Sequence, residues 1–240
     1  MTATSASELR LIAGGSLAGL FKELGPLFEK TSGHTLAIHF DSTPNIISRI
    51  NSGTPFNAVV VPVDVFKDGD AKGHLTAPAE IARVGYGVIV RAGAAKPDLS
   101  TADAFKKSLL AAASVASVPA SAAGAYVTKV YERLGIADEM KAKTKVEALP
   151  TAIAPAVAKG EAELGVFLTN VFNAPGIELA GPFPADLQQE LAFAAAIAKE
   201  TNRDAKATVA AKALLDFLKT PPAIAAIKAA GMTPAPLPID

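Results

Sequence analysis

Short apolar segments alternate with segments of helical periodicity along the first quarter of the chain. The apolar segments cover 9–13, 36–40 and 58–62. After the first of them, Leu17, Leu20 and Leu24 recur at the spacing of one helix face, and Ser16 is the expected N-cap. Strand–helix–strand alternation favours a mostly parallel sheet with helices on both faces. The sequence therefore predicts an α/β fold.

The alternation continues to the end of the chain. We expect further strands at 83–91, 114–118 and 164–168 and helices at 124–134, 149–159, 205–218 and 222–230. Segment 191–198 is apolar throughout and is either a strand or a helix by periodicity alone. Thr43 is the expected N-cap of another helix, with Pro44 at its first position. Pro155 should either kink its helix or lie in the first turn.

Charge and residue composition exclude several classes of function. Lys+Arg and Asp+Glu both number 23, so no basic surplus points to nucleic acid. The charge of any ligand must therefore be balanced by residues at the binding site itself. Cysteine is absent, and His34, His39 and His74 are scattered without metal spacing, so we expect no metal and no cofactor. No nucleotide-binding or hydrolase motif is present.

The longest apolar runs are too short to span a membrane, so we expect no membrane insertion. The polar segment 1–8 lacks the basic and apolar regions of a signal peptide. It looks like the start of a mature exported protein, which predicts a periplasmic location.

Several short motifs occur in an order that resembles a known family. They are Ala13-Gly-Gly-Ser-Leu17, Phe40-Asp-Ser-Thr43, Ala122-Ala-Gly-Ala-Tyr126 and Gly160-Glu-Ala-Glu-Leu-Gly-Val166. Together, over about 9–231, the chain resembles the type II periplasmic binding proteins, and within them the molybdate- and tungstate-binding proteins of ABC importers. No single motif is specific, and the likeness lies in their order and spacing.

The resemblance implies two α/β lobes with a ligand in the cleft between them. The lobes would be 9–84 plus 196–240, and 86–190, with crossing strands near 83–86 and 191–195. It also implies a monomer that binds a small anion, with an ABC transporter permease as a partner if the protein serves transport.

The family holds its oxyanion with hydroxyls and backbone N–H groups, which helix N-termini supply. By resemblance, Ser16 and Thr43 provide hydroxyls and Ala123 provides an N–H. Two further positions depart from the pattern, because Pro150 has no N–H and Leu168 replaces a tyrosine hydroxyl. The loss of two donors predicts weak binding of molybdate.

Asp41 is a third departure from the family pattern, because a carboxylate beside a doubly charged oxyanion is repulsive. We therefore expect an organic di- or tricarboxylate as the ligand. Weaker candidates for ligand contact are Ser42, Ser121, Gly124, Arg83, Thr169 and Asn170. Arg83 is either a cleft cation or part of a structural salt bridge.

Two functions remain open at this point, a solute-binding protein and an enzyme. A periplasmic aconitate isomerase has this same fold and a similar size. It shifts a proton along an allylic carboxylate, which needs a base and donors that stabilise enolate-like charge. Asp41 is the candidate base, and His39 or Asp64 would be next. Binding of molybdate or tungstate for import is the third possibility.

Overall fold

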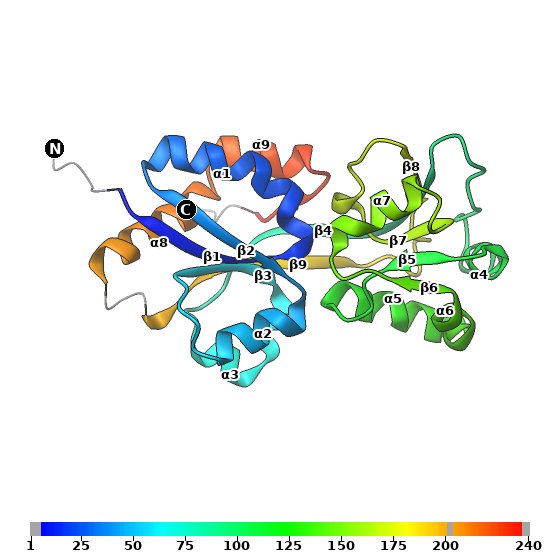
Figure 1. Ribbon diagram of the computed structural model, residues 1–240, viewed down its shortest axis with the longest axis horizontal. Helices are drawn as coiled ribbons and strands as arrows, with labels where there is room; N and C mark the ends of the chain where they lie inside the picture. The colour runs from blue at the N-terminus through cyan, green and yellow to red at the C-terminus, as the bar shows by residue number, and fades with distance from the viewer. Residues whose placement is uncertain (1–5, 201–203, 237–240) are drawn as a thin grey trace. The chain divides into compact units, whose positions relative to one another are not determined.

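The computed structural model describes residues 6–200 and 204–236 (Figure 1). The chain forms two compact units. Unit 1 contains the residues up to Arg83 and those from Ala192 onward, and unit 2 spans Val84–Leu191. Strands β4 (Ala79–Arg91) and β9 (Glu190–Ile197) each carry the chain from one unit into the other.

Unit 1 is built on a sheet with the strand order β2–β1–β3–β9. Its strands are β1 (Glu8–Gly14), β2 (Thr35–Asp41) and β3 (Ala58–Pro62), with the short β10 (Thr233–Pro234) paired to β4. β1 runs parallel to both β2 and β3, whereas β9 pairs antiparallel with β3. The carboxyl ends of three parallel strands therefore meet at one edge of this sheet.

Helices cover both faces of the unit 1 sheet (Figure 1). On one face α1 (Ala18–Ser32) packs against α8 (Ala205–Phe217) and α9 (Pro221–Ala229), with Phe28 and Phe217 in edge contact. The other face carries α2 (Thr43–Asn51), α3 (Gly69–Gly73) and the short turn η2 (Val63–Lys67). The buried core between this face of the sheet and its helices includes Ile12, Ile46, Ile50, Val59 and Val61.

Unit 2 contains a second sheet with the order β4–β7–β5–β6. Its further strands are β5 (Val115–Ser117), β6 (Thr144–Val146), β7 (Leu164–Leu168) and β8 (Ile177–Pro182). Its helices are α4 (Ala102–Ala111), α5 (Ala122–Arg133), α6 (Ala137–Lys143) and α7 (Ile153–Ala158). β5 runs parallel to β6 and β7, whereas β4 pairs antiparallel with β7 and β8.

The expected α/β fold is confirmed, and each unit has a mixed sheet, because the antiparallel strands β4 and β9 join the parallel ones. Of the apolar segment 191–198, residues 191–197 belong to strand β9. Segment 149–159 divides into a short turn, η3 (Pro150–Ala152), and α7, whose third residue is Pro155. A proline in the first turn removes no intrahelical hydrogen bond, so it causes no kink.

Two expected helix caps are wrong by a short distance. Helix α2 begins at Thr43 itself, and the extended residue Ser42 is its N-cap. Ser16 lies inside the short 3-10 turn η1 (Gly15–Leu17), and Leu17 occupies the cap of α1. In both places the chain turns directly out of a strand, so helical backbone already includes the residue that was expected to be the cap. Among the described residues, no helix is long and apolar enough to cross a bilayer.

Candidate functional site

Ser16 and Thr43 follow neighbouring strands at the carboxyl edge of the unit 1 sheet. Gly14, the last residue of β1, is in register with Asp41, the last residue of β2. Turn η1 leaves β1 immediately after this pair, and Ser42 and Thr43 leave β2. The carboxyl edge of an open α/β sheet is where ligands usually bind. The topology therefore brings the two expected hydroxyl residues to one edge of one unit.

The exit from β1 is tightly packed. A methyl group on Gly14 would lie 3.2 Å from Cδ of Pro62 and 3.4 Å from a ring carbon of Phe193. Ser16 and Thr43 are only 8% and 9% exposed. Neighbours on β3 and β9 thus restrict the path of the chain that positions Ser16.

Asp41 is held by three groups at this edge. Its Oδ1 accepts hydrogen bonds from the Ser42 N–H and from Nδ2 of Asn45, both at 2.8 Å, and its Oδ2 lies 3.2 Å from Nε2 of His39. Partial burial raises the pKa of Asp41, but the hydrogen bonds from Asn45, Ser42 and His39 outweigh it and hold the pKa below its usual value. Asp41 is therefore an ionised acceptor near neutral pH and a weaker base than a free aspartate.

The sequence analysis did not single out Asn45, although a signal was present. Asn45 lies four residues after Asp41, in the first turn of α2. Side chains of Asp and Asn commonly bond to one another and to nearby backbone where a helix starts. His39 lies two residues before Asp41, and alternate residues of a strand share a face.

Unit 2 has a corresponding carboxyl edge where β5 and β7 run parallel. Helix α5 follows β5, and Ser121 is its N-cap. The Ser121 hydroxyl accepts from the Gly124 N–H at 2.9 Å and donates to the Val118 carbonyl at 2.7 Å. Ala123 is 3% exposed and lies in the first turn, where backbone N–H groups have no intrahelical acceptor. The Ser121 hydroxyl thus accepts the hydrogen bond of the Gly124 N–H. Ala123 remains the candidate N–H donor to a ligand in this first turn.

The start of α5 lies directly on the loop that precedes it. A methyl group on Gly124 would be 1.8 Å from the Val118 carbonyl oxygen and 2.6 Å from Cα of Pro119. No side chain fits at that separation, so glycine is required for this close approach. The requirement is steric, because Gly124 lies within α5 itself.

The weaker candidates have local partners. Arg83 forms a two-point ion pair with Glu80, with Nε–Oε1 and NH2–Oε2 distances of 2.6 and 3.0 Å, on the exposed start of β4. Thr169 and Asn170 lie in the turn η4 (Thr169–Val171) after β7, and the Thr169 hydroxyl is 3.3 Å from the Gly85 carbonyl oxygen. Of the two interpretations of Arg83, the salt bridge is the one that the structure contains.

The two positions that depart from the family pattern lie inside unit 2. Leu168 is fully buried and pairs with Tyr86 across β7 and β4. Pro150 is buried at the start of η3. Tyr126 donates its hydroxyl to the Leu187 carbonyl at 2.8 Å and packs on Tyr86, so it has a structural role. None of these groups replaces the missing tyrosine hydroxyl at position 168.

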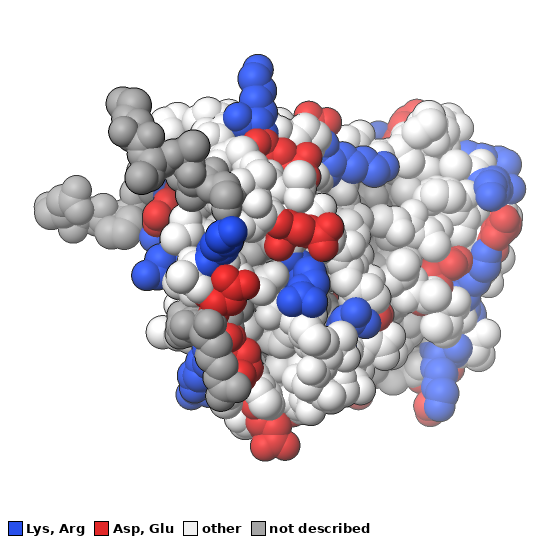
Figure 2. All heavy atoms as spheres, turned by 60° about the vertical axis from the view of Figure 1, so that its left-hand side comes forward, with Lys and Arg blue, Asp and Glu red and all other residues white. Residues whose placement is uncertain are grey.

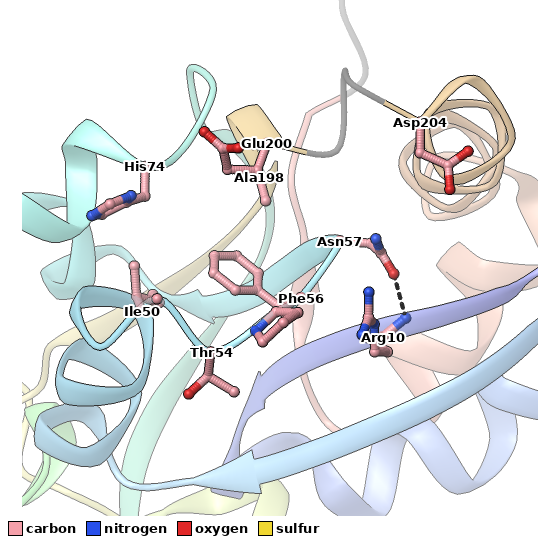
Figure 3. A pocket seen from close by; sticks show the side chains of 11 residues that line it. Arg10, Ile50, Thr54, Phe56, Asn57, His74, Ala198, Glu200 and Asp204 are labelled. Carbon is pink, nitrogen blue, oxygen red and sulfur yellow. Dashed lines mark hydrogen bonds between the residues drawn. The ribbon is translucent and has the colours of Figure 1, made fainter.

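Charged side chains of both signs are interspersed on the face shown in Figure 2, in keeping with the zero net charge. Within the described residues, no three His, Cys, Asp or Glu side chains group in a way that would hold a metal ion. One hollow of unit 1, about 320 Å³, lies near Arg10, Phe56 and His74 (Figure 3). None of the expected site residues lines it.

A family model for bacterial extracellular solute-binding proteins matches residues 9–233. The chain belongs to this family. An aconitate isomerase from Pseudomonas sp. is 31% identical to it, and the likeness covers 98% of this chain and 91% of the relative. The molybdate-binding protein ModA of Azotobacter vinelandii is 28% identical, covering 95% and 91%.

Solved structures of family relatives have the same fold. The periplasmic molybdate-binding protein of Azotobacter vinelandii superimposes with a TM-score of 0.74 at 23% identity, covering 95% of this chain and all of that one. The expected type II periplasmic binding fold is therefore confirmed. The relatives include both an enzyme and anion binders, so the family alone does not name the ligand.

Proposed function

We propose that this solute-binding family member binds a small organic di- or tricarboxylate at the carboxyl edge of unit 1. The observation that carries the proposal is the register of Gly14 with Asp41, which brings Ser16 and Thr43 out of the sheet from adjacent positions. Both residues begin or precede a helix, where hydroxyl and N–H groups suit an oxyanion. That Ala123 contacts the same ligand stays a prediction from the resemblance.

A carboxylate ligand fits the local groups better than molybdate does. Leu168 offers no hydroxyl, Pro150 offers no N–H, and the Gly124 N–H is already bonded to Ser121. Each lost charge-assisted hydrogen bond lowers binding by about 1.5–3 kcal/mol. Asp41 adds a negative charge beside the Ser42–Thr43 turn. A flexible polycarboxylate can place its charged groups away from Asp41, whereas a compact oxyanion cannot.

The second candidate function is isomerisation of aconitate, and the pair of Asp41 with His39 favours it. The reaction removes a proton from a carbon next to the double bond and returns one at the other end of the allylic system, so no cofactor is consumed. Asp41 at 24% side-chain exposure and His39 at 42% are both reachable by water. We propose that one member of this pair moves the proton while Ser16 and Thr43 stabilise the negative charge.

The two proposed functions differ in whether the protein needs a partner protein. The family is one of extracellular proteins. We propose an ABC transporter permease as the partner of the solute-binding function only. The enzyme would work without one, so turnover by the purified chain would favour isomerisation.

A thermal-shift screen tests the binding proposal. Citrate, cis-aconitate and trans-aconitate should each raise the melting temperature, because a ligand at one hundred times its Kd stabilises by about 2.7 kcal/mol. Molybdate and sulfate should have little effect. Ser16→Ala and Thr43→Val should reduce the shift, whereas Ser108→Ala, on α4 of unit 2, should not. A shift with molybdate alone would contradict the proposal.

Proton NMR of purified protein with either aconitate isomer separates the two functions. Interconversion without added metal or nucleotide supports the enzyme, and binding without interconversion leaves the solute-binding protein. Asp41→Asn should abolish turnover while binding persists if Asp41 moves the proton. Turnover that survives in Asp41→Asn but is lost in His39→Gln would assign the proton transfer to His39.

A further inference from the structure

One face of the unit 1 sheet is left uncovered beyond the end of α2. In β1 and β2, Arg10 is in register with Ala37 and Ile12 with His39, so these four alternate residues share a face. Ile12 lies under α2 in the buried core, whereas Arg10 and Ala37 are exposed. The face is thus closed at its carboxyl end and open near Arg10.

A hollow of about 300 Å³ occupies this open part of the face. It is lined by Arg10, Leu11, Ile12, Ala37, Ile38, His39, Arg49, Pro55 and Phe56. Arg10, Pro55 and Phe56 also line the hollow of Figure 3, in which Phe56 stands between Thr54 and Asn57. Phe56 packs against the α2-side core, so one wall of the hollow is anchored to the core of unit 1.

The charged residues that line this hollow are all cationic or can become so. Arg10 comes from β1, His39 from β2 and Arg49 from α2, and no Asp or Glu lines the hollow. Within the described part of the chain, neither guanidinium forms an ion pair or hydrogen bond. His39 is paired with Asp41, whose carboxylate is also bonded by Ser42 and Asn45.

The carboxylates in the neighbourhood of Arg10 form no ion pair with it. Glu8 lies two residues before it on the same strand, and Glu200 and Asp204 line the adjoining hollow. None of the three comes within 4.0 Å of the Arg10 guanidinium among the described contacts. Two unpaired guanidinium groups at one apolar wall therefore remain available to a ligand.

We propose that this hollow is a second binding site, for a small organic oxyanion with a compact apolar body. A guanidinium presents a planar fork that matches a carboxylate or phosphate. Ala37, Pro55 and Phe56 offer apolar contact for the rest of the ligand. The volume lies at the lower end of that of ligand pockets, which suits a single ring. Neither Ser16 nor Thr43 lines this hollow, so it is distinct from the proposed carboxylate site, and His39 is the one residue that the two sites share.

An amide NMR titration of the whole chain tests the proposal. The probes are phenyl phosphate and phenylacetate, which present the two oxyanions, and the neutral 2-phenylethanol. Both anions should shift the resonances of Arg10, His39, Arg49 and Phe56, and the neutral probe should not. If only phenyl phosphate does so, the site takes phosphates, and if only phenylacetate does, it takes carboxylates.

Substitution of the two arginines supplies the second measurement. Arg10→Gln with Arg49→Gln should weaken binding of the anionic probes at least about tenfold, because charge-assisted hydrogen bonds are lost. Arg91→Gln, an exposed position of unit 2, is the control and should bind normally. Ser16→Ala should also leave this site unchanged. Equal binding of the neutral probe, or no loss in the double variant, would overturn the proposal.

Discussion

The carboxyl edges of the two units are chemically different, although both lie at the ends of parallel strands. In unit 1 the edge carries side-chain chemistry, with the residues Ser16 and Thr43 beside the ionised Asp41 and its partner His39. In unit 2 the edge consists mainly of a helix start, and its cap Ser121 already binds the Gly124 N–H. The unit 1 edge therefore presents side-chain charge and hydroxyls, whereas the unit 2 edge presents the backbone N–H groups of a helix start.

This difference predicts how substitutions act. At the unit 2 edge they should act through packing and helix capping, and so change stability. At the unit 1 edge they should act on the ligand, and so change affinity or turnover while the fold persists.

The largest expected effect is at Gly124. Gly124→Ala places a methyl group 1.8 Å from the Val118 carbonyl oxygen, so α5 must move away from its loop. We expect a loss of about 3 kcal/mol or more in stability, measured by denaturant unfolding. Gly19→Ala is the matched control, because a methyl group there meets nothing within 4 Å and alanine favours a helix. Equal stability of both variants would show that α5 can relax at no cost.

Ser16→Ala should show the opposite behaviour. Alanine is slightly smaller than serine and fits the packed turn at this 8% exposed position, so the loss of stability should be smaller than at Gly124. Affinity for trans-aconitate or citrate should fall about tenfold by calorimetry, as expected when one hydrogen bond to a charged group is lost. Unchanged affinity would remove Ser16 from the ligand site.

Ser121→Ala tests the capping role in unit 2. We expect a loss of about 1 kcal/mol in stability, because the Gly124 N–H loses its acceptor. Affinity should stay within about twofold of the wild type, as the Ser121 hydroxyl is already bonded to Val118. A large loss of affinity with unchanged stability would place Ser121 at the ligand instead.

The smallest expected effect is the pH dependence that Asp41 contributes. Its folded pKa is lowered, so its stabilisation is present above the unfolded value near 3.8 and is lost as pH falls through the folded pKa. Asn45→Ala removes one of the bonds that lower this pKa and should shrink that loss. Urea unfolding between pH 2 and 6 measures it, with Asp41→Asn as the reference that lacks the group. Identical pH profiles for wild type and Asn45→Ala would contradict the role of Asn45.

Much of the fold could be predicted from the sequence, because buried strands and helix ends have local signals. The strands at 58–62 and 164–168 are found with the expected bounds, since uniform apolar runs can only be buried. Gly33 and Gly53 have φ near +73°, the left-handed conformation that ends a helix and favours glycine. Such features depend on neighbours in the sequence.

The candidate site was predicted only in part. The positions of Ser16 and Thr43 at a strand end followed from the alternation of elements. Their neighbours did not, because the register of β1 with β2 joins residues 27 positions apart. The hydrogen bond from the Gly124 N–H to Ser121 was also not predicted, although Gly124 was one of the weaker candidates for ligand contact. A family resemblance does not show which other group an N–H bonds.

The sequence by itself determined that this chain is an α/β protein and that its candidate ligand-binding residues Ser16 and Thr43 follow strands. The tertiary structure decided that 191–197 is a strand, because only pairing with β3 distinguishes it from a buried helix. It also decided the state of Asp41, whose carboxylate is shared among His39, Ser42 and Asn45. Hydrophobic periodicity in the sequence indicates which residues are buried. The pairing of strands and the ionisation of a carboxylate depend on which residues are in contact in the folded chain.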